Sequence, residues 1–294
     1  MVGFGDGRCI DGVTVGEFFE RIREAAGGDF ADLGLLVGDP EAEVRSIAVG
    51  IEVGVEEIRR AARLREEGKG PDLLLSHHFS QLGGGRIDVR KVLERQREAL
   101  VEAGVPERRA LKLTLKLATL KEMEAGMRSD EPLRLALKFA LPLGVVHTPA
   151  DLFAERHLKG MVRERKPSTL EELVEALRPI PEYQKAEGRG ERLAIILGSP
   201  KRPVGGLFYC VSIGWNPLPE AFEELGRAGR VRTVLTTSAT AALVEACKKA
   251  GLNLVELPHY GTDSLGLNLL LDAILPEEVI IEPCAHFIRV RRGG

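Results

Sequence analysis

Short apolar segments that alternate with amphipathic helical patterns constrain the fold of this chain more than any other feature. Residues 34–38, 46–51 and 73–76 are apolar runs of strand length, and periodic patterns predict helices at about 14–26 and 55–66. Strands separated by helices need crossover connections, which give a parallel or mixed sheet with helices on its faces. The sequence therefore predicts an α/β fold.

The chain is long enough for two such units. Its 294 residues are 44% hydrophobic, which suffices for a large core, and single cores stop growing near this size. Residues 178–191 are rich in Pro, Gly and charge and have no periodicity that would bury a face, so we place a boundary there. We predict a first α/β lobe at 1–180 and a second α/β lobe at 181–294.

A helical insertion interrupts the first lobe between about residues 86 and 140. Leucines recur there among lysines and arginines, which predicts three helices, with Lys112, Lys116 and Lys121 on the solvent-facing side. A strand at 143–146 then returns to the first sheet. Beyond the boundary, strands are predicted at 193–197, 207–213, 233–236, 253–256 and 279–282, with helices at 218–226, 239–250 and 264–274.

Side chains that bind metals follow three of the predicted strands. They are His77 and His78 after residues 73–76, His147 and Asp151 after 143–146, and His259 and Asp263 after 253–256. Ligands of open α/β sheets gather in the loops at the carboxyl ends of the strands. Imidazole and carboxylate without thiolate favour Zn, Mn, Fe, Co or Ni over Ca or Mg. We therefore predict a site for one or two transition-metal ions.

Ordinary structural roles remain open for the single residues. Thr148-Pro149 is a good helix start, with Thr148 as N-cap and Pro149 as the first helical residue, and an acid in the first turn, such as Asp151, is favoured by the helix dipole. Asp263 has a similar explanation, and His259 has the context of an ordinary loop histidine. The adjacent pair His77-His78 is harder to explain this way, because neighbouring side chains of a strand point to opposite faces.

Four segments together resemble a known family. They are Gly-Leu-Leu-Val-Gly at 34–38, Ser-His-His at 76–78, His-Thr-Pro-Ala-Asp at 147–151 and His-Tyr-Gly-Thr-Asp at 259–263. Their order and spacing are similar to those of the Nif-three-like family of dinuclear-metal proteins, some of which carry a GTP cyclohydrolase type-2-like label. The resemblance covers roughly residues 30–80, 143–157 and 230–275.

The resemblance implies a metal site and an architecture. It places His77, His78, Asp151 and His259 on the metal ligands of the family, and Asp263 where the family usually has a glutamate that reaches both ions. His147 lies in the site by the same analogy. The implied fold is two related α/β lobes that face each other across the metals, commonly assembled into a toroidal hexamer. Asp263 is one methylene shorter than glutamate, which leaves open whether one or two ions bind.

These observations predict a metal-dependent hydrolase. One or two ions would activate water, and His147 is the candidate proton carrier, because imidazole titrates near neutrality. A nucleotide or a phosphate ester is a possible small-molecule substrate, and the substrate itself stays open. The alternative is a non-catalytic metal-binding scaffold, or an oligomeric ring that recruits partners. The length of the insertion, with its apolar stripe, favours this alternative.

Charge and cysteine content exclude other classes. A net charge of -3 gives no overall reason to bind nucleic acid or an anionic membrane. Cys9, Cys210, Cys247 and Cys284 are scattered, which suggests neither a zinc knuckle nor a disulfide framework. Residues 1–8 lack the layout of a signal peptide, and no apolar run approaches the length of a membrane span. We expect a cytoplasmic protein.

Overall fold

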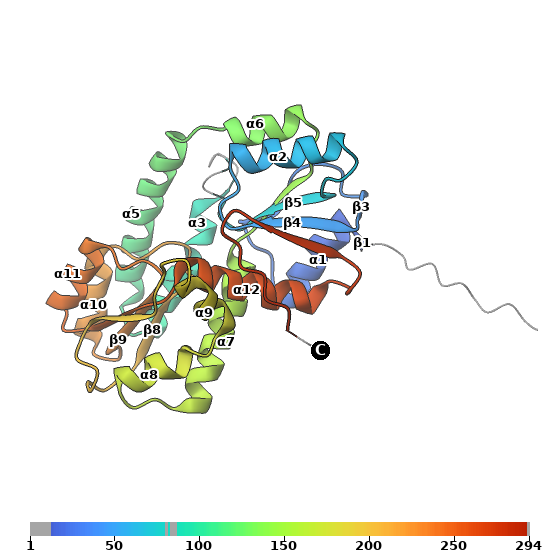
Figure 1. Ribbon diagram of the computed structural model, residues 1–294. Coiled ribbons are helices and arrows are strands. Elements are labelled where there is room, and N and C mark those ends of the chain that lie inside the picture. Colours follow the sequence, from blue (N-terminus) through green and yellow to red (C-terminus); the bar gives the residue numbers. More distant parts are fainter. Residues whose placement is uncertain (1–12, 80–81, 83–86, 293–294) are drawn as a thin grey trace, which may run out of the picture.

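The computed structural model describes residues 13–79, 82 and 87–292. Residues 1–8 and Cys9, which entered the prediction of location, lie outside the described residues. Two α/β lobes are present, each built on one mixed sheet, and a helical insertion runs beside them (Figure 1). The predicted fold class is confirmed.

The first lobe is built on a five-stranded sheet in the order β11-β4-β5-β6-β2. Neighbouring strands are parallel except for β2, which runs antiparallel to β6. The strands are β2 (Leu33–Val37), β4 (Ser46–Gly50), β5 (Leu73–Ser76), β6 (Leu143–Val146) and β11 (Ile280–Cys284). Every residue of β5 and β6 is buried, as expected of central strands with both faces covered. A small separate sheet pairs β1 (Val13–Thr14) with β3 (Glu43–Val44).

Helices cover both faces of this sheet. Alternate side chains of β4 and β5, such as Ile47 and Leu73, pack with α1 (Val15–Ala26) and α12 (His259–Ile274), while Ala48 and Leu74 face the other way. The second face is covered by α2 (Val55–Glu66) and by α6 (Glu131–Lys138) of the insertion (Figure 1). Successive side chains of β4 and β5 thus alternate between two separate apolar cores, one on each face of the sheet.

The second lobe repeats this plan on a four-stranded sheet in the order β7-β10-β9-β8. Its inner pairs are parallel, and β7 is an antiparallel edge strand. The strands are β7 (Ala194–Leu197), β8 (Leu207–Cys210), β9 (Thr233–Thr236) and β10 (Asn253–Glu256). The helices around it are α7 (Thr148–Arg165), α8 (Leu170–Leu177), α9 (Pro181–Glu187), α10 (Pro219–Ala228) and α11 (Ala241–Lys249).

The insertion connects the two lobes rather than extending only the first. It contains α3 (Val89–Val92), α4 (Glu94–Glu102), α5 (Glu107–Gly126) and α6. This is one helix more than predicted, because α3 ends and α4 begins at Leu93. Leu100 and Leu113 of the insertion belong to the same core as Phe208 and Phe222 of the second lobe. In Figure 1, α5 runs along the side of the molecule from α6 toward the second lobe.

Two segments differ from expectation. The strand predicted at 279–282 is present as β11, but it pairs with β4 of the first sheet, so the chain returns to the first lobe at its end. Residues 178–191, predicted to have nothing to bury, include α9, whose Glu182 and Tyr183 are buried. Glu182 pairs with Arg292, a partner far along the chain that no local pattern reveals. The division into domains at 180/181 stays a prediction.

Among the helices that the structure describes, none has both the length and the apolar character needed to cross a bilayer.

Candidate metal centre

The carboxyl ends of β5 and β6 bring three histidines together. His77 and His78 directly follow β5, and His147 directly follows β6, which is the neighbouring parallel strand. The rings of His77 and His78 have centroids 5.0 Å apart, and the rings of His77 and His147 are stacked at 4.7 Å. The adjacent imidazoles therefore do enter one site, just beyond the last residue pair of the strand ladder.

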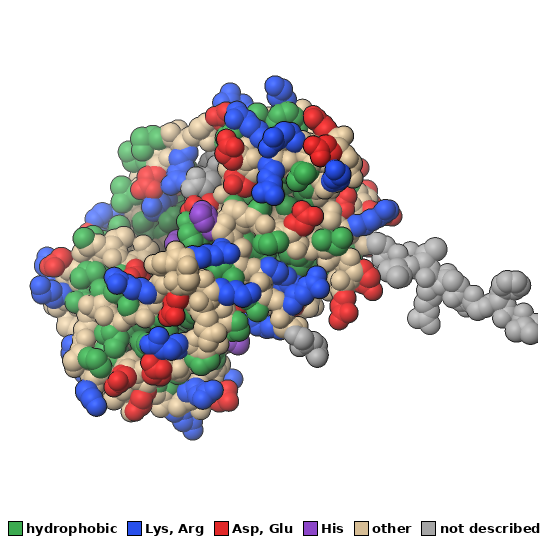
Figure 2. Space-filling view, viewed as in Figure 1, with side chains coloured by type: hydrophobic (Ala, Val, Ile, Leu, Met, Phe, Trp, Pro, Cys, Tyr) green, Lys and Arg blue, Asp and Glu red, His purple; other side chains and the backbone are tan. Residues whose placement is uncertain are grey.

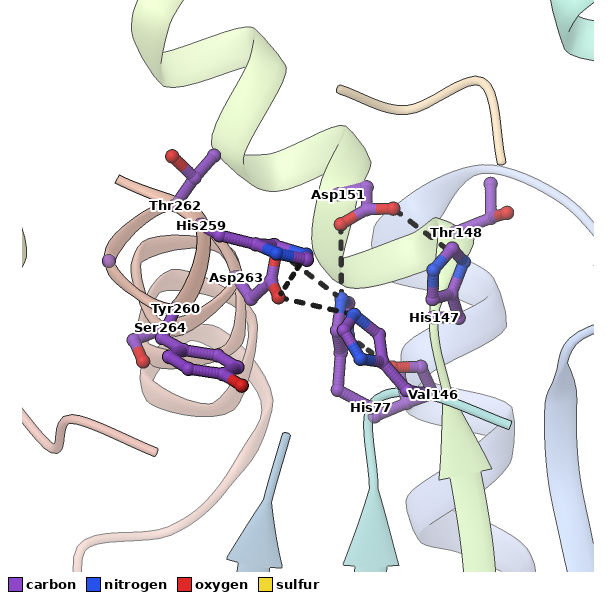
Figure 3. Close-up of polar contacts among 12 residues, drawn as sticks. His77, Val146, His147, Thr148, Asp151, His259, Tyr260, Thr262, Asp263 and Ser264 are labelled. Carbon is purple, nitrogen blue, oxygen red and sulfur yellow. Dashed lines mark hydrogen bonds and ion pairs between the residues drawn. The ribbon is translucent and has the colours of Figure 1, made fainter. Parts of the chain in front are cut away.

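His77 is oriented by the backbone of β6. Its Nδ1 lies 2.9 Å from the carbonyl oxygen of Val146, and because a carbonyl only accepts, Nδ1 must carry the proton. This leaves Nε2 without a proton in the neutral ring. Nε2 lies 3.3 Å from Oδ1 of Asp151 and 3.8 Å from Oδ1 of Asp263 (Figure 3). A histidine held in this way is typical of metal sites, where the second ring nitrogen is fixed by a hydrogen bond.

Asp263 faces a second pair of imidazoles with its other oxygen. Oδ2 lies 3.3 Å from Nε2 of His78 and 3.5 Å from Nε2 of His259, which is one helical turn earlier on α12. Its Oδ1 faces His77, so the two oxygens of one carboxylate point toward different histidines (Figure 3). Asp263 is buried, and its Oδ2 makes no hydrogen bond with the described residues.

Asp151 faces the other metal-binding side chains instead of the end of its helix. Together they form what we call the cluster: His77, His78, His147, Asp151, His259 and Asp263. Its oxygens lie 3.3 Å from Nε2 of His77 and 3.6 Å from Nδ1 of His147. Helix α7 begins one residue earlier than predicted, with His147 at the N-cap and no side chain in the capping role. The predicted capping residue Thr148 uses its hydroxyl to donate to Asp32.

Asp32 is a residue to which sequence analysis assigned no role. It is 1% exposed, and its Oδ2 accepts hydrogen bonds from Nδ1 of His147 at 3.0 Å and from the backbone and hydroxyl of Thr148. The only sequence signal was its place just before the Gly-Leu-Leu-Val-Gly segment. Asp32 therefore fixes the ring of His147 through Nδ1, the same nitrogen that lies 3.6 Å from Asp151.

The electrostatics of the site favour positive charge. Burial lowers the pKa of His78, but the carboxylates of Asp263 and Glu52 outweigh it and raise that pKa to about 10. Burial raises the pKa of Asp263, yet the facing histidines His259, His77 and His78 hold it well below its usual range. Burial likewise disfavours protonated His147, and Asp151 and Asp32 raise its pKa. The carboxylates therefore stabilise positive charge in the site, carried either by protonated histidines or by metal ions.

The spacing of the donor atoms is compatible with metal coordination. Histidine nitrogens and the oxygens of Asp151 and Asp263 lie 3.3 to 3.8 Å apart, which is longer than the usual hydrogen bond of about 2.7–3.2 Å. Two ligands on one tetrahedral ion with bonds of about 2.0–2.2 Å lie about 3.3–3.6 Å apart. Apart from the 3.8 Å between His77 and Asp263, these separations fit a metal ion, and so does the buried Oδ2 of Asp263, which makes no hydrogen bond with the described residues.

The donors form three overlapping groups whose atoms all lie within 4.8 Å of one another. The groups are His77, His78 and His147; His78, His259 and Asp263; and His77, Asp151 and Asp263. Asp263 belongs to two groups together with different histidines. All six residues singled out from the sequence are therefore brought together, and these buried His and Asp groups could hold a metal ion.

A cleft of about 470 Å³ opens beside the cluster. Glu52, His78, His147 and the two aspartates line it on one side, and Oε1 of Glu52 lies 3.6 Å from Nδ1 of His78. The second lobe contributes the loop at 214–216 and residues near 238, and α5 contributes Leu117 and Lys121. Lys121 therefore lines the cleft, whereas we expected it on the solvent-facing side of its helix. Histidine surface is visible in the hollow where the two lobes meet (Figure 2).

Comparisons with known proteins identify the fold. No family model matches the sequence, and no curated protein matches it. Solved structures do match. A NIF3 superfamily protein from Sphaerobacter thermophilus has a TM-score of 0.79 at 24% identity, covering 94% of this chain and 99% of that one. Reduced HcgD from Methanocaldococcus jannaschii has a TM-score of 0.53 at 16% identity, covering 92% and 97%.

A hypothetical protein of Staphylococcus aureus has a TM-score of 0.50 at 13% identity, covering 93% of this chain and 97% of that one. The matches extend over nearly the whole length of each chain. They show that this chain has the fold of NIF3 superfamily proteins, as the resemblance in sequence predicted.

Proposed function

We propose that this chain is a member of the NIF3 superfamily and acts as a metal-dependent hydrolase with two transition-metal ions. The proposal rests on one observation above all. The two oxygens of Asp263 face different histidines: Oδ2 lies 3.3 Å from His78 and 3.5 Å from His259, separations that ligands of one tetrahedral ion have, while Oδ1 lies 3.8 Å from His77. A carboxylate placed in this way is suited to bridge two ions.

Each of the proposed ions has its own ligands. One would be held by His77, Asp151 and Oδ1 of Asp263, and the other by His78, His259 and Oδ2 of Asp263. Nitrogen and oxygen donors without thiolate suit Zn, Mn, Fe, Co or Ni. Ions with open coordination positions lower the pKa of water and stabilise the negative charge that develops on an attacked centre.

The protein residues contribute proton transfer and orientation. We propose that His147 carries a proton between the cluster and the cleft, because its ring belongs to the cluster and also lines the cleft, and Asp32 holds its Nδ1 so that Nε2 can exchange the proton. The hydrogen bond of Asp32 also fixes the plane of the ring. The cleft admits a small-molecule substrate, and Lys121 and Arg128 in its wall favour a nucleotide or another phosphate ester.

Elemental analysis together with turnover tests this proposal. We expect purified protein to contain a transition metal in stoichiometric amount and to hydrolyse a member of a panel of phosphate esters and nucleotides. His78→Ala should lose metal and turnover together, while His157→Ala, a half-buried histidine of α7 outside the cluster, should keep both. Full metal retention in His77→Ala and His78→Ala proteins would show that the site is wrong.

A non-catalytic scaffold is the second candidate, and one observation favours it. Large apolar side chains are exposed along α5 and at its C-cap; they are Leu111, Leu115, Leu120 and Met123 of the helix and Met127 at the cap. Apolar surface of this kind marks sites of protein interaction. Stoichiometric metal without turnover on the whole panel would support the scaffold and contradict the hydrolase.

We also propose a homo-oligomer, a hexamer by analogy with the family, in the reducing cytoplasm. Cys210, Cys247 and Cys284 are free thiols, which suits a reducing compartment. Light scattering coupled to size-exclusion chromatography measures the assembly directly, and a mass of one chain would contradict it.

A further inference from the structure

A row of aromatic rings leads from the histidine and aspartate cluster into the cleft. The ring of Phe79 contacts the edge of His147 at a centroid distance of 5.3 Å, and Trp215 contacts Phe79 at 5.5 Å. Lys121 of α5 lies over Trp215, with Nζ at 5.8 Å from the ring centroid. All four residues line the same cleft. The row therefore connects the cluster to a cation supplied by the helical insertion.

The loop that carries Trp215 is held in place by buried polar contacts. Nε2 of Gln96, which is 1% exposed, donates to the carbonyl of Trp215 at 2.7 Å. The neighbouring Asn216 donates to the carbonyl of Ser238 at 2.8 Å and accepts from the hydroxyl of Thr236. Because the insertion and the second sheet both fix this loop, the indole presents a prepared surface to the cleft.

Charge is separated along the cleft. Carboxylates line its cluster end, where Glu52, Asp151 and Asp263 lie, whereas the ammonium group of Lys121 lines it beside Trp215 of the second lobe. Nζ of Lys121 donates to Glu124 at 2.8 Å, but an ammonium group has three donors. An anionic group that does not react is therefore best placed at a remaining donor of Lys121, away from the carboxylates Glu52, Asp151 and Asp263 of the cluster end.

We infer that Trp215 and Lys121 form a subsite for a planar ring that carries an anionic group, so that the substrate class is a ring-bearing organic anion. As a statement about substrate, this inference rests on the proposed hydrolase function. The ring lies against the aromatic surface, and the anion lies at the ammonium group of Lys121. Specificity then comes from the insertion and the second lobe, whereas the reacting bond lies at the cluster.

Fluorescence of the protein tests this subsite directly, because Trp215 is the only tryptophan of the chain. AMP and phenyl phosphate each combine a ring with an anion, adenosine has only the ring, and ribose 5-phosphate has only the anion. We expect AMP or phenyl phosphate to quench Trp215 saturably and at lower concentration than either half-molecule. Quenching by AMP but not by phenyl phosphate would show that the subsite selects nucleotides. Quenching by both would show that it accepts ring-bearing organic anions in general.

Two variants locate the anion. Lys121→Met should weaken binding of the quenching ligand about tenfold or more, the size expected for a charged hydrogen bond. Lys112→Met, the same change on the exposed face of the same helix, should leave binding unchanged. The unliganded emission spectrum of each variant checks that the environment of Trp215 is intact.

His78→Ala separates this inference from the proposed function. The subsite lies away from the cluster, so binding should persist in His78→Ala protein even where metal and turnover are lost. Binding that is lost in His78→Ala but kept in Lys121→Met would place the anion on the metals and overturn the inference. No quenching by either ring-bearing anion, or equal binding of ribose 5-phosphate and AMP, would overturn it as well.

Discussion

At the residue scale, one short side chain decides how the cluster is connected. Asp263 is one methylene shorter than the glutamate that the resemblance in sequence implies, yet its oxygens reach to 3.3 Å from His78 and 3.8 Å from His77. We expect Asp263→Asn to reduce bound metal to one ion or fewer, because an amide has lost the charge and one of the two oxygens. Elemental analysis after gel filtration measures this, and an unchanged metal content would contradict the bridging role.

Asp32 supports a second prediction at this scale. Because Asp32 holds Nδ1 of His147, Asp32→Asn should lower turnover about 10–100-fold while the metal content stays within error. The matched control is Asp29→Asn, an exposed acid three residues earlier in the chain. If Asp32→Asn instead loses metal in parallel with activity, His147 is a metal ligand rather than a proton carrier.

The protonation of His78 predicts how metal-free protein responds to pH. Its pKa of about 10 in the folded chain lies above the unfolded value of about 6.5, so its contribution to stability is complete below pH 6.5 and is lost as pH rises through 10. Chelated wild-type protein should therefore lose stability over this window, and His78→Ala should lose less. Urea unfolding at a series of pH values measures both, and parallel curves would contradict the charge pairing.

At the scale of the elements, the crossing of α7 and α12 sets the position of both aspartates. Gly266 of α12 lies so close to α7 that an added Cβ would overlap the carbonyl group of Ala150, next to Asp151. This close approach brings Asp263, one turn before Gly266, toward the strand ends. It explains how the short side chain of Asp263 reaches the histidines at the strand ends.

Gly266→Ala should therefore push the two helices apart. We expect a loss of about 1–3 kcal/mol in the free energy of unfolding and a reduced metal content, because a packed core does not absorb the added methyl group. Gly160→Ala on α7 is the control, since a Cβ there has no neighbour within 4 Å and removal of a helical glycine stabilises by up to about 1 kcal/mol. Equal stability of the two variants would contradict this account.

The sequence predicted these elements unequally well. The apolar run at 73–76 coincides with β5, and the strand–histidine order placed His77, His78 and His147 at one edge of a sheet. The role of Asp32 was missed, because it depends on a hydrogen bond to a residue 115 positions away. The helix α9 was missed for the same reason, since Glu182 is buried through its pairing with Arg292.

At the scale of the whole molecule, segments distant in sequence complete each unit. The pattern of β11 predicts a strand but not its partner, and β11 closes the first sheet beside β4 from the far end of the chain. The insertion packs into the core of the second lobe and lines the cleft through Lys121, which its helical period alone assigned to solvent. Local patterns therefore predicted the fold class, while the connections between lobes needed the tertiary structure.

We propose above that the cluster between the lobes holds two metal ions that share Asp263. X-ray anomalous scattering from crystals of the purified protein, recorded at the absorption edge of the metal found by elemental analysis, tests this most directly. We predict two peaks at coordination distance, one beside His77 and Asp151 and the other beside His78 and His259, with Asp263 between them. A single peak would contradict the shared carboxylate, and the absence of any peak at these residues would contradict the metal site itself.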